Sequence, residues 1–500
     1  MYYLFGFLMA VSALMASALS GCTVGPDYRR PEEPTVPAYT AGSLPEETAA
    51  APGAGATGAA QRFVIGQDIP EQWWTLFRSE PLTAVIRQAL VDNPTYAAAQ
   101  AALRQAQEIR RAQAGALVPA VDANVSAYRV RQSGAAAGLD GTDTFALYNA
   151  SVNVSYTLDL FGGLHRELEA LQAQVDYRRF QMEGVYLVLT ANIVTAAVRE
   201  AALRDQLLAM RHILAVQEKQ LEAIESQLRL GRVSRSDLLA QRTEIALTRA
   251  ALPPLEKELA QTRHLLAVLA GRYPHEAEAL PEFRIDDLQL PRELPVSLPS
   301  SLARQRPDIR AAEELLHAAS AQVGVATANL YPQLTLTGSF GMAAGTIGAL
   351  FGSGASIFTL GAGALQPLFH GGTLDARHSA ALAAYDQAAA QYRATVLQAF
   401  QNVADVLRAL EADAHTLKAQ AEAATAAQDA FDLTREQFRL GAVNYLSLLN
   451  AERQYRQVRI SLVQAQAARF ADTAALFQAL GGGWWNRAPQ TKEAATAGTP

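Results

Sequence analysis

Two related stretches decide the fold of this chain: SQLRLGRVSRSDLL at residues 226–239 and EQFRLGAVNYLSLL at residues 436–449. Each contains a Leu-Gly pair, Leu230-Gly231 in the first and Leu440-Gly441 in the second, after a long run of good helix formers. Glycine readily adopts the left-handed backbone conformation with which many helices end. Each stretch therefore predicts a tight turn between two antiparallel helices.

The helices on both sides of these turns are predicted to be long. Residues 164–230 and 374–440 precede the turns, and the returning helices are expected to end near Gly271 and Gly481. At about 1.5 Å per residue, either longer run would reach on the order of 100 Å. Such length indicates coiled-coil or helical-barrel packing rather than a soluble globule. Pro253-Pro254 is expected to kink or break the first returning helix.

The similarity of the two stretches extends to a duplication of most of the chain. Other motifs recur in the same order, at offsets between 208 and 213 residues. They are Asn93-Pro94 and Arg306-Pro307, Pro119 and Pro332, and Leu160-Phe161-Gly162-Gly163 and Leu368-Phe369-His370-Gly371-Gly372. A repeat of this period indicates a duplicated domain rather than a solenoid.

The N-terminus contains a predicted export signal. Residues 2–19 are almost continuously apolar, and Leu19-Ser20-Gly21-Cys22 ends the run with small residues and the single cysteine. This pattern resembles a bacterial lipoprotein signal, in which Cys22 receives a diacylglyceryl group and becomes the new N-terminus. Thr23 follows, where an Asp would resemble an inner-membrane retention signal. Sorting to the outer membrane is therefore expected.

Each half also contains a pair of predicted strands. Apolar and polar residues alternate in 148–160 and 121–128, and more weakly in 334–340 and 357–365. One apolar and one polar face suit either a soluble sandwich or a membrane barrel. The long helices and the export signal favour the barrel.

Closure of such a barrel needs more than one chain. An open sheet edge cannot lie in lipid. The smallest membrane barrels have about eight strands, so four are too few. Three chains would supply twelve strands, although composition alone does not determine that number.

Composition excludes several classes of protein and site. The net charge of −6 shows no basic footprint, so nucleic acid is not an expected partner. One cysteine excludes a disulfide framework and Cys-based metal sites within one chain. Glu314 and His317 have the spacing of a di-iron ligand pair, but a single copy is weak and an exposed helix face is expected. We therefore expect no catalytic residue, no cofactor and no metal.

Two further features are assigned structural roles. Residues 24–62 are rich in Pro, Gly, Ala and Glu and are predicted to be a low-complexity linker, including the G-x-G-x-x-G match at 53–58. Trp73-Trp74 and Trp484-Trp485 are expected to pack structurally rather than to bind a ligand.

The chain resembles the outer-membrane efflux proteins, or TolC-like channels, and within them the lipoprotein branch of tripartite multidrug pumps. The motifs are Leu19–Cys22 with Pro26-Asp27-Tyr28, Trp73-Trp74 with Phe77 and Pro81-Leu82, the run Arg306–Glu313, and the two Leu-Gly turns. The resemblance implies an α+β membrane protein, a homotrimer with a twelve-stranded β-barrel, four strands per chain, continuous with a long periplasmic α-helical barrel. It also implies a lipid-anchored outer-membrane location, a periplasmic adaptor (membrane fusion protein), an inner-membrane pump expected to be proton-driven, and no enzymatic activity.

These interpretations divide the chain into six parts. We expect a signal peptide at 1–21, an N-terminal linker and equatorial segment at 22–80, and a first structural repeat at 81–280. A Pro-rich bridge at 281–299, a second repeat at 300–485 and a disordered tail at 486–500 follow.

The resemblance also places a periplasmic gate at the helix turns. The family has a Tyr-Leu pair in the second turn and later an Asp that rings the constriction, and the matching residues are Tyr445, Leu446 and Asn450. Asn450 stands where the family has the Asp, so a trimer of this chain would lack the ring of three negative charges at the constriction. Charged rings of this kind set ion selectivity. Asp237 would line the pore or cap the returning helix. Leu230-Gly231 and Leu440-Gly441 would contact the adaptor, or would be plain helix ends.

Two alternative functions stay open. One is a TolC-like conduit for type I protein secretion rather than for small molecules. The other is a periplasmic structural lipoprotein without a pore, against which the alternating strands argue.

Overall fold

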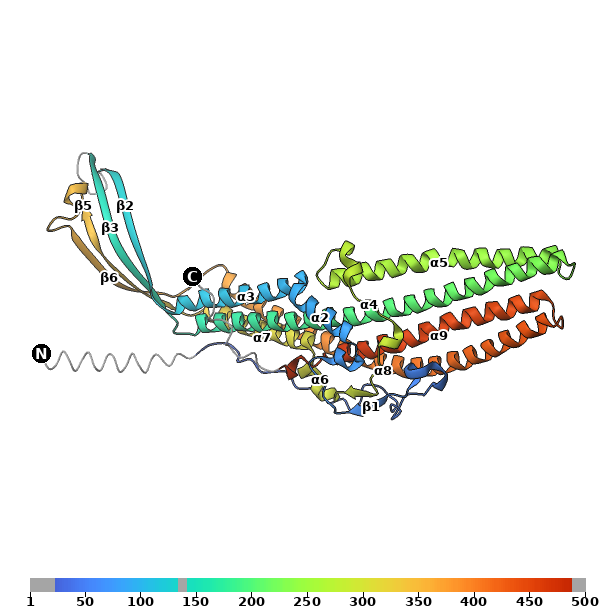
Figure 1. Cartoon of the computed structure of the whole chain (residues 1–500). Coiled ribbons are helices and arrows are strands. Elements are labelled where there is room, and N and C mark those ends of the chain that lie inside the picture. Colours follow the sequence, from blue (N-terminus) through green and yellow to red (C-terminus); the bar gives the residue numbers. More distant parts are fainter. Residues whose placement is uncertain (1–22, 134–141, 488–500) are drawn as a thin grey trace. The chain divides into compact units, whose positions relative to one another are not determined.

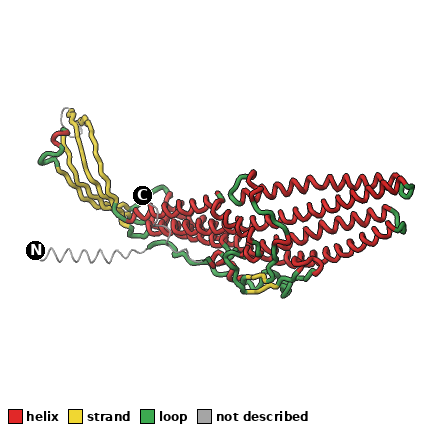
Figure 2. Tube along the Cα trace, viewed as in Figure 1, coloured by secondary structure: helices red, strands yellow, loops and turns green. Residues whose placement is uncertain are grey.

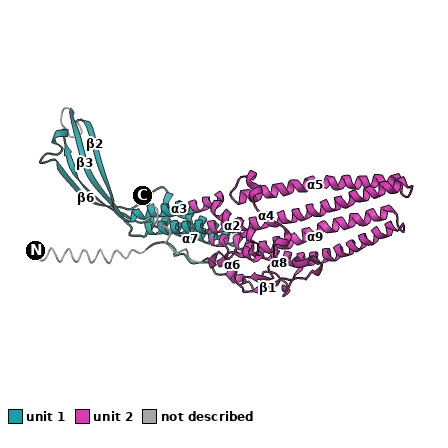
Figure 3. Ribbon diagram, viewed as in Figure 1, with its two compact units in different colours: residues 1–31, 102–179, 311–393 teal, residues 32–101, 180–310, 394–500 magenta. Residues whose placement is uncertain are grey.

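The computed structural model describes residues 23–133 and 142–487 of the 500-residue chain (Figure 1). The predicted signal peptide at 1–21 and Cys22 lie outside these residues. The chain forms two compact units (Figure 3). Unit 1 contains residues 102–179 and 311–393 with the N-terminal segment to Pro31, and unit 2 contains the remainder. Each unit takes segments from both halves of the duplication.

Helices make up most of the chain. The α-helices are α2 (Glu80–Asp92), α3 (Pro94–Ala114), α4 (Gly163–Arg229), α5 (Arg235–Leu269), α6 (Pro299–Gln305), α7 (Pro307–Ala328), α8 (Thr373–Arg439) and α9 (Tyr445–Ala479). Short 3₁₀ helices are η1 (Pro52–Gly58), η2 (Trp73–Phe77), η3 (Gly115–Leu117), η5 (Pro274–Ala279), η6 (Ile285–Asp287), η7 (Ile347–Ala349) and η8 (Trp484–Asn486). Both α4 and α8 have 67 residues, and both α5 and α9 have 35. These equal lengths confirm the long helices predicted before and after the two turns.

Unit 1 contains one four-stranded antiparallel sheet, coloured yellow in Figure 2. Its strands are β2 (Ala120–Ser133), β3 (Thr142–Leu158), β5 (Gln333–Ala344) and β6 (Ser356–Leu365), in the order β2-β3-β5-β6. Each half of the duplication supplies one hairpin, and the hairpins pair through β3 and β5, with Val152 opposite Phe340. The four predicted strands are confirmed. The edge strands β2 and β6 have no outer partner among the described residues.

Unit 2 contains a smaller sheet and an aromatic core. Strands β1 (Arg62–Ile65) and β4 (Glu293–Val296) form a parallel pair. Trp73 and Trp74 of η2 are buried, and Trp73 stacks on Phe477 of α9 with ring centroids 5.2 Å apart. Trp484 donates its indole N–H to the Gln305 carbonyl oxygen at 2.7 Å. The tryptophan pairs therefore pack structurally, as predicted.

Of the kink or break predicted at Pro253-Pro254 in the first returning helix, the break is wrong. Helix α5 continues through both prolines to Leu269. Each proline removes an N–H that would bond to the carbonyl oxygen four residues earlier, at Arg249 and Ala250. All four residues are exposed in the chain, so water can satisfy the two freed oxygens.

The linker prediction is wrong for the segment around η1. Ala51 and Ala54 pack in one buried cluster with Leu417 and Ala421 of α8. The fully buried Arg469 of α9 donates hydrogen bonds to Thr48 Oγ1, the carbonyl oxygens of Thr57 and Ala59, and Gln61 Oε1, at 2.9 to 3.2 Å. Small side chains let this segment lie flat on the helices, and one guanidinium satisfies its oxygens. Composition alone does not reveal that partner.

The exposed helix face predicted for Glu314 and His317 is also wrong. Their side chains are only 12% and 24% exposed. The His317 ring stacks on Tyr28 with centroids 4.2 Å apart, and its nitrogens lie 3.3 Å from a Glu314 oxygen and 3.0 Å from a Glu169 oxygen. The N-terminal segment covers this part of α7. The described residues contain no group of three His, Cys, Asp or Glu suited to holding a metal ion.

Candidate functional site

The two Leu-Gly pairs end α4 and α8 with the same backbone geometry. Gly231 has φ of 71° and Gly441 has φ of 77°. The Gly231 N–H donates to the Leu228 carbonyl oxygen and the next N–H reaches the Gln227 carbonyl oxygen, and the second turn repeats both bonds. This is a Schellman ending, in which left-handed glycine lets the last carbonyls find donors. The helix-end interpretation of both motifs is therefore confirmed.

The leucines beside these glycines face away from the helices. Leu230 is 67% exposed and Leu440 is 69% exposed. An exposed leucine contributes nothing to the helix ending, which uses backbone groups only. Both side chains are therefore free to contact another molecule.

Side-chain caps begin the returning helices. The Asp237 carboxylate accepts hydrogen bonds from the Ser234 backbone N–H at 2.9 Å and from Ser234 Oγ at 2.7 Å. Ser234 Oγ in turn accepts from the Asp237 N–H. In the second turn, Asn444 accepts from the Ser447 N–H at 2.9 Å. The capping role left open for Asp237 is therefore confirmed, and its carboxylate is largely occupied.

Tyr445, at the start of α9, points into the packed hairpins. It is buried in a cluster with Ile224, Phe431, Leu448 and Leu449. Its hydroxyl donates to Oε1 of Gln241 on α5, so it links α9 to the other hairpin. Burial raises the pKa of the Tyr445 hydroxyl above its usual range, and the group stays protonated as a donor.

Leu446 and Asn450 lie on an exposed side of α9, away from the buried side that carries Tyr445. Leu446 is 58% exposed and Asn450 is exposed as well. Residues four apart in a helix share a face, so the two side chains are neighbours along one exposed stripe. The structure thus separates the predicted gate residues: Tyr445 packs inward, while Leu446 and Asn450 face outward.

A buried polar layer lies between α5 and α9, about two helical turns beyond the start of each helix. The sequence interpretation missed it. The Glu244 carboxylate on α5 accepts a hydrogen bond from Arg453 of α9 and lies 3.6 Å from Nη1 of Arg456. Glu452 is buried beside Gln217, and burial raises the pKa of its carboxyl. Glu244 follows Asp237 by seven residues, and Glu452 follows Tyr445 by seven. For Glu452, the spacing of seven from an aromatic residue is a sequence signal of a buried helix position, whereas Asp237 is a capping residue and gives no such signal for Glu244.

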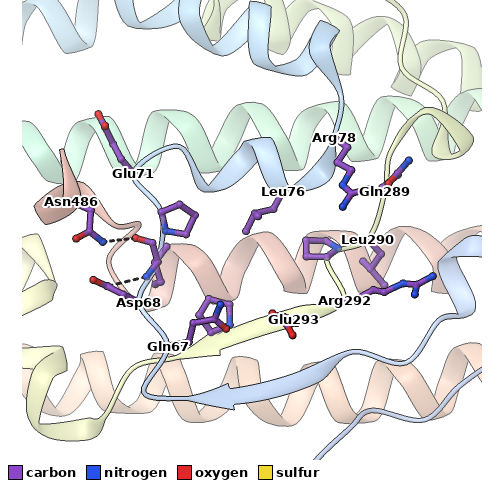
Figure 4. A pocket seen from close by; sticks show the side chains of 14 residues that line it. Gln67, Asp68, Glu71, Leu76, Arg78, Gln289, Leu290, Arg292, Glu293 and Asn486 are labelled. Atoms are coloured by element: carbon purple, nitrogen blue, oxygen red, sulfur yellow. Dashed lines mark hydrogen bonds between the residues drawn. The ribbon is translucent and has the colours of Figure 1, made fainter. Parts of the chain in front are cut away.

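Unit 2 also contains a groove of about 1220 Å³ (Figure 4). Asp68, Arg78, Arg292 and Asn486 are among its lining residues. Asp68 Oδ1 accepts from the Ile69 N–H at 2.9 Å, and Asn486 Nδ2 donates to the Ile69 carbonyl oxygen at 2.7 Å. These bonds order the backbone and bring no set of catalytic groups together. They also show that the start of the expected tail at 486–500 is held in place, whereas residues 488–500 lie outside the described chain.

Residues 85–272 and 298–482 match the family described as "Outer membrane efflux protein". The pyoverdine export outer membrane protein OpmQ of Pseudomonas putida is 32% identical over 85% of this chain and 90% of its own length. The toluene efflux pump outer membrane protein TtgC of Pseudomonas putida is 29% identical over 98% of both chains.

A solved structure shares the fold. The outer-membrane channel OprN matches with a TM-score of 0.82 and 28% identity, over 93% of this chain and all of that one. Long helices and four antiparallel strands are therefore arranged as in TolC-like outer-membrane channels. Proteins of this class transport and do not catalyse. The chain belongs to the outer membrane efflux protein family.

Proposed function

We propose that three copies of this chain form the outer-membrane duct of a tripartite efflux system. The observation that carries the proposal is the four-stranded sheet with two edge strands, β2 and β6, that lack outer partners among the described residues. Such edges cannot be left open in lipid, and three chains would close a barrel of twelve strands. The duct would receive substrates from a proton-driven inner-membrane pump through a periplasmic adaptor.

Small molecules are the proposed substrates. Relatives are named for export of pyoverdine and efflux of toluene, which supports small molecules over secreted polypeptides. Family membership also argues against a structural lipoprotein without a pore. The duct itself is passive, since the family transports without catalysis.

Lipid anchoring at Cys22 is part of the proposal. Cys22 lies outside the described residues, but the chain that follows it is held in unit 1. The Val24 N–H donates to the Phe161 carbonyl oxygen at 3.1 Å, just beyond the end of β3. Asp27 pairs with Arg166 at 2.7 Å. These contacts support an anchor placed beside the base of the strands, where acyl chains would enter the outer membrane.

The gate is proposed at the exposed stripe of α9. Leu446 would form an apolar ring that resists wetting, and Asn450 would add an uncharged polar ring behind it. Tyr445 would set the position of the stripe through its link to Gln241, and Asp237 would fix the start of the neighbouring helix α5 through its cap. The ring at Asn450 would therefore not select cations by charge.

Planar-bilayer conductance tests the gate. Leu446→Ser should raise the conductance of the resting channel, because a hydroxyl wets the constriction. Leu239→Ser is the matched control, since Leu239 is similarly exposed, at 53%, near the start of α5. Unchanged conductance in Leu446→Ser, or an equal rise in the control, would rule out this gate. No conductance in either the wild type or Leu446→Ser would contradict the proposed duct.

A further inference from the structure

The turn between α4 and α5 carries unpaired positive charge. Arg229, Arg232 and Arg235 are all exposed. Among the described residues, none of these three guanidinium groups has an ion-pair or hydrogen-bond partner. Asp237 is the carboxylate within residues 226–239, and its oxygens cap α5 through Ser234. The turn therefore presents a concentrated, uncompensated cationic surface.

The duplicated turn between α8 and α9 provides an internal comparison. At the equivalent positions it has Arg439, Ala442 and Tyr445. Arg439 forms an ion pair with Glu436 at 2.5 Å, and Tyr445 is buried. The second turn is therefore electrically compensated. The two turns share a backbone and differ in charge, so the arginines are not needed to make the turn.

Helix electrostatics explain only part of this charge. A cation at the end of a helix interacts favourably with the helix dipole, which accounts for Arg229 and equally for Arg439. Arg235 is the first residue of α5, where the same dipole disfavours a cation. Arg232 lies in the turn itself. The stability of the helices therefore does not explain why Arg232 and Arg235 occupy this turn. A partner that binds the α4–α5 turn would explain both residues.

We propose that the α4–α5 turn docks an acidic segment of the periplasmic adaptor, whereas the α8–α9 turn makes uncharged contacts. This inference rests on the proposed efflux function. The occupant is a helix end that presents Asp or Glu side chains to the arginines and a small apolar surface to the exposed Leu230. In a trimer, three acidic-binding turns and three neutral ones would fix the rotational register of the adaptor.

The two turns pack together at one end of unit 2 (Figure 1), which supports a shared docking surface. The cluster around Tyr445 joins residues from α4, α5, α8 and α9. An adaptor that contacts one turn is therefore within reach of the other. Anionic lipid is a less suitable occupant, because α4 separates this turn from β3 by 67 residues of helix.

Binding of the full-length channel to a purified adaptor tests the inference. The probe is the adaptor with which the wild-type channel restores drug efflux in a strain lacking its own outer-membrane channel. Arg232→Glu with Arg235→Glu should weaken binding about tenfold or more, since two attractive pairs become repulsive. Wild-type binding should also weaken between about 0.05 M and about 0.5 M NaCl.

Matched variants keep the test decisive. Arg439→Glu with Ala442→Glu places similar charge on the second turn and should weaken binding much less. Arg232→Gln with Arg235→Gln should give an intermediate loss, and circular dichroism should show wild-type helix content in all three. Equal losses at both turns, or wild-type affinity in the Glu variant, would overturn the inference. So would loss of binding to phosphatidylglycerol vesicles with adaptor binding intact, which would assign the arginines to lipid. A wild-type channel that restores efflux with no adaptor would contradict the proposed function instead.

Discussion

Replacing Arg453 by glutamine should loosen the contact between α5 and α9 behind the turns. The Glu244 side chain is 1% exposed, and its carboxylate is held by Arg453 and, at 3.6 Å, by Arg456. Glutamine keeps most of the length of the side chain but removes the charge. Glu244 would then be a buried carboxylate with one distant cation. The two hairpins would lose their main polar link at this level.

The expected cost follows from the burial of the two partners. Breaking a fully buried ion pair costs about 3–5 kcal/mol. The Arg453 side chain is 47% exposed, and Arg456 remains nearby, so solvent screening reduces the loss to about 2 kcal/mol. That is about 30-fold in an equilibrium constant. The population in which α5 separates from α9 should rise by this factor.

Amide hydrogen exchange of the detergent-solubilised channel measures this population. Peptides covering the start of α5 should exchange about 30-fold faster in Arg453→Gln. The matched control is Arg249→Gln, whose partner Glu218 forms an exposed pair with side chains 61% and 45% accessible; its loss should have almost no effect. Equal exchange in the two variants would refute the assignment of Glu244 and Arg453 as the link. If the Glu244–Arg453 pair also holds the gate shut, the resting conductance of Arg453→Gln should be higher than that of the wild type.

Three further predictions follow from other contacts. Cys22→Ala should abolish labelling with radioactive palmitate; a labelled variant would contradict lipidation at that residue. Arg469→Met would leave four oxygens of residues 48–61 without their donor, at about 1–3 kcal/mol each before relaxation. The Ala51 amide, bonded to Gly58, should then exchange much faster, and wild-type exchange would contradict this role. The pKa of His317 is raised above 6.5, mainly by its hydrogen bond to Glu314. Its stabilising charge is complete below 6.5 and lost as pH rises through the raised pKa, so residues 24–30 should open at higher pH. His317→Gln should remove that dependence.

Much of the fold was predictable because local patterns repeat over long distances. Periodicity over the 67 residues of α4 and α8 outweighs any single residue, and left-handed glycines mark both turns. The strands alternate strictly enough to be found, although β2, β3 and β5 extend beyond the predicted bounds. Repetition strengthened each assignment, since two independent copies had to agree.

The predictions that were wrong concern residues whose tertiary surroundings decide their role. Pro253 and Pro254 were judged by helix propensity alone, and their exposure to water, which sets the cost, is a tertiary property. The segment around η1 has a linker composition, yet Arg469, more than 400 residues later in the sequence, donates hydrogen bonds to it. Glu314 and His317 looked exposed on their own helix, and Tyr28 of the N-terminal segment covers His317.

By itself, the sequence determined the duplication, the helical hairpins, the strand pairs and the resemblance to a family of outer-membrane channels. It also determined which residues occupy the turns, because glycine and capping side chains act within a few positions of one another. Only the tertiary structure decided which face each turn residue presents. Tyr445 packs inward and Leu446 outward because the neighbouring hairpin supplies Gln241 as a partner for the Tyr445 hydroxyl. The charged layer at Glu244 and Arg453 was likewise decided by contact between helices distant in the chain, where burial makes each unpaired charge costly.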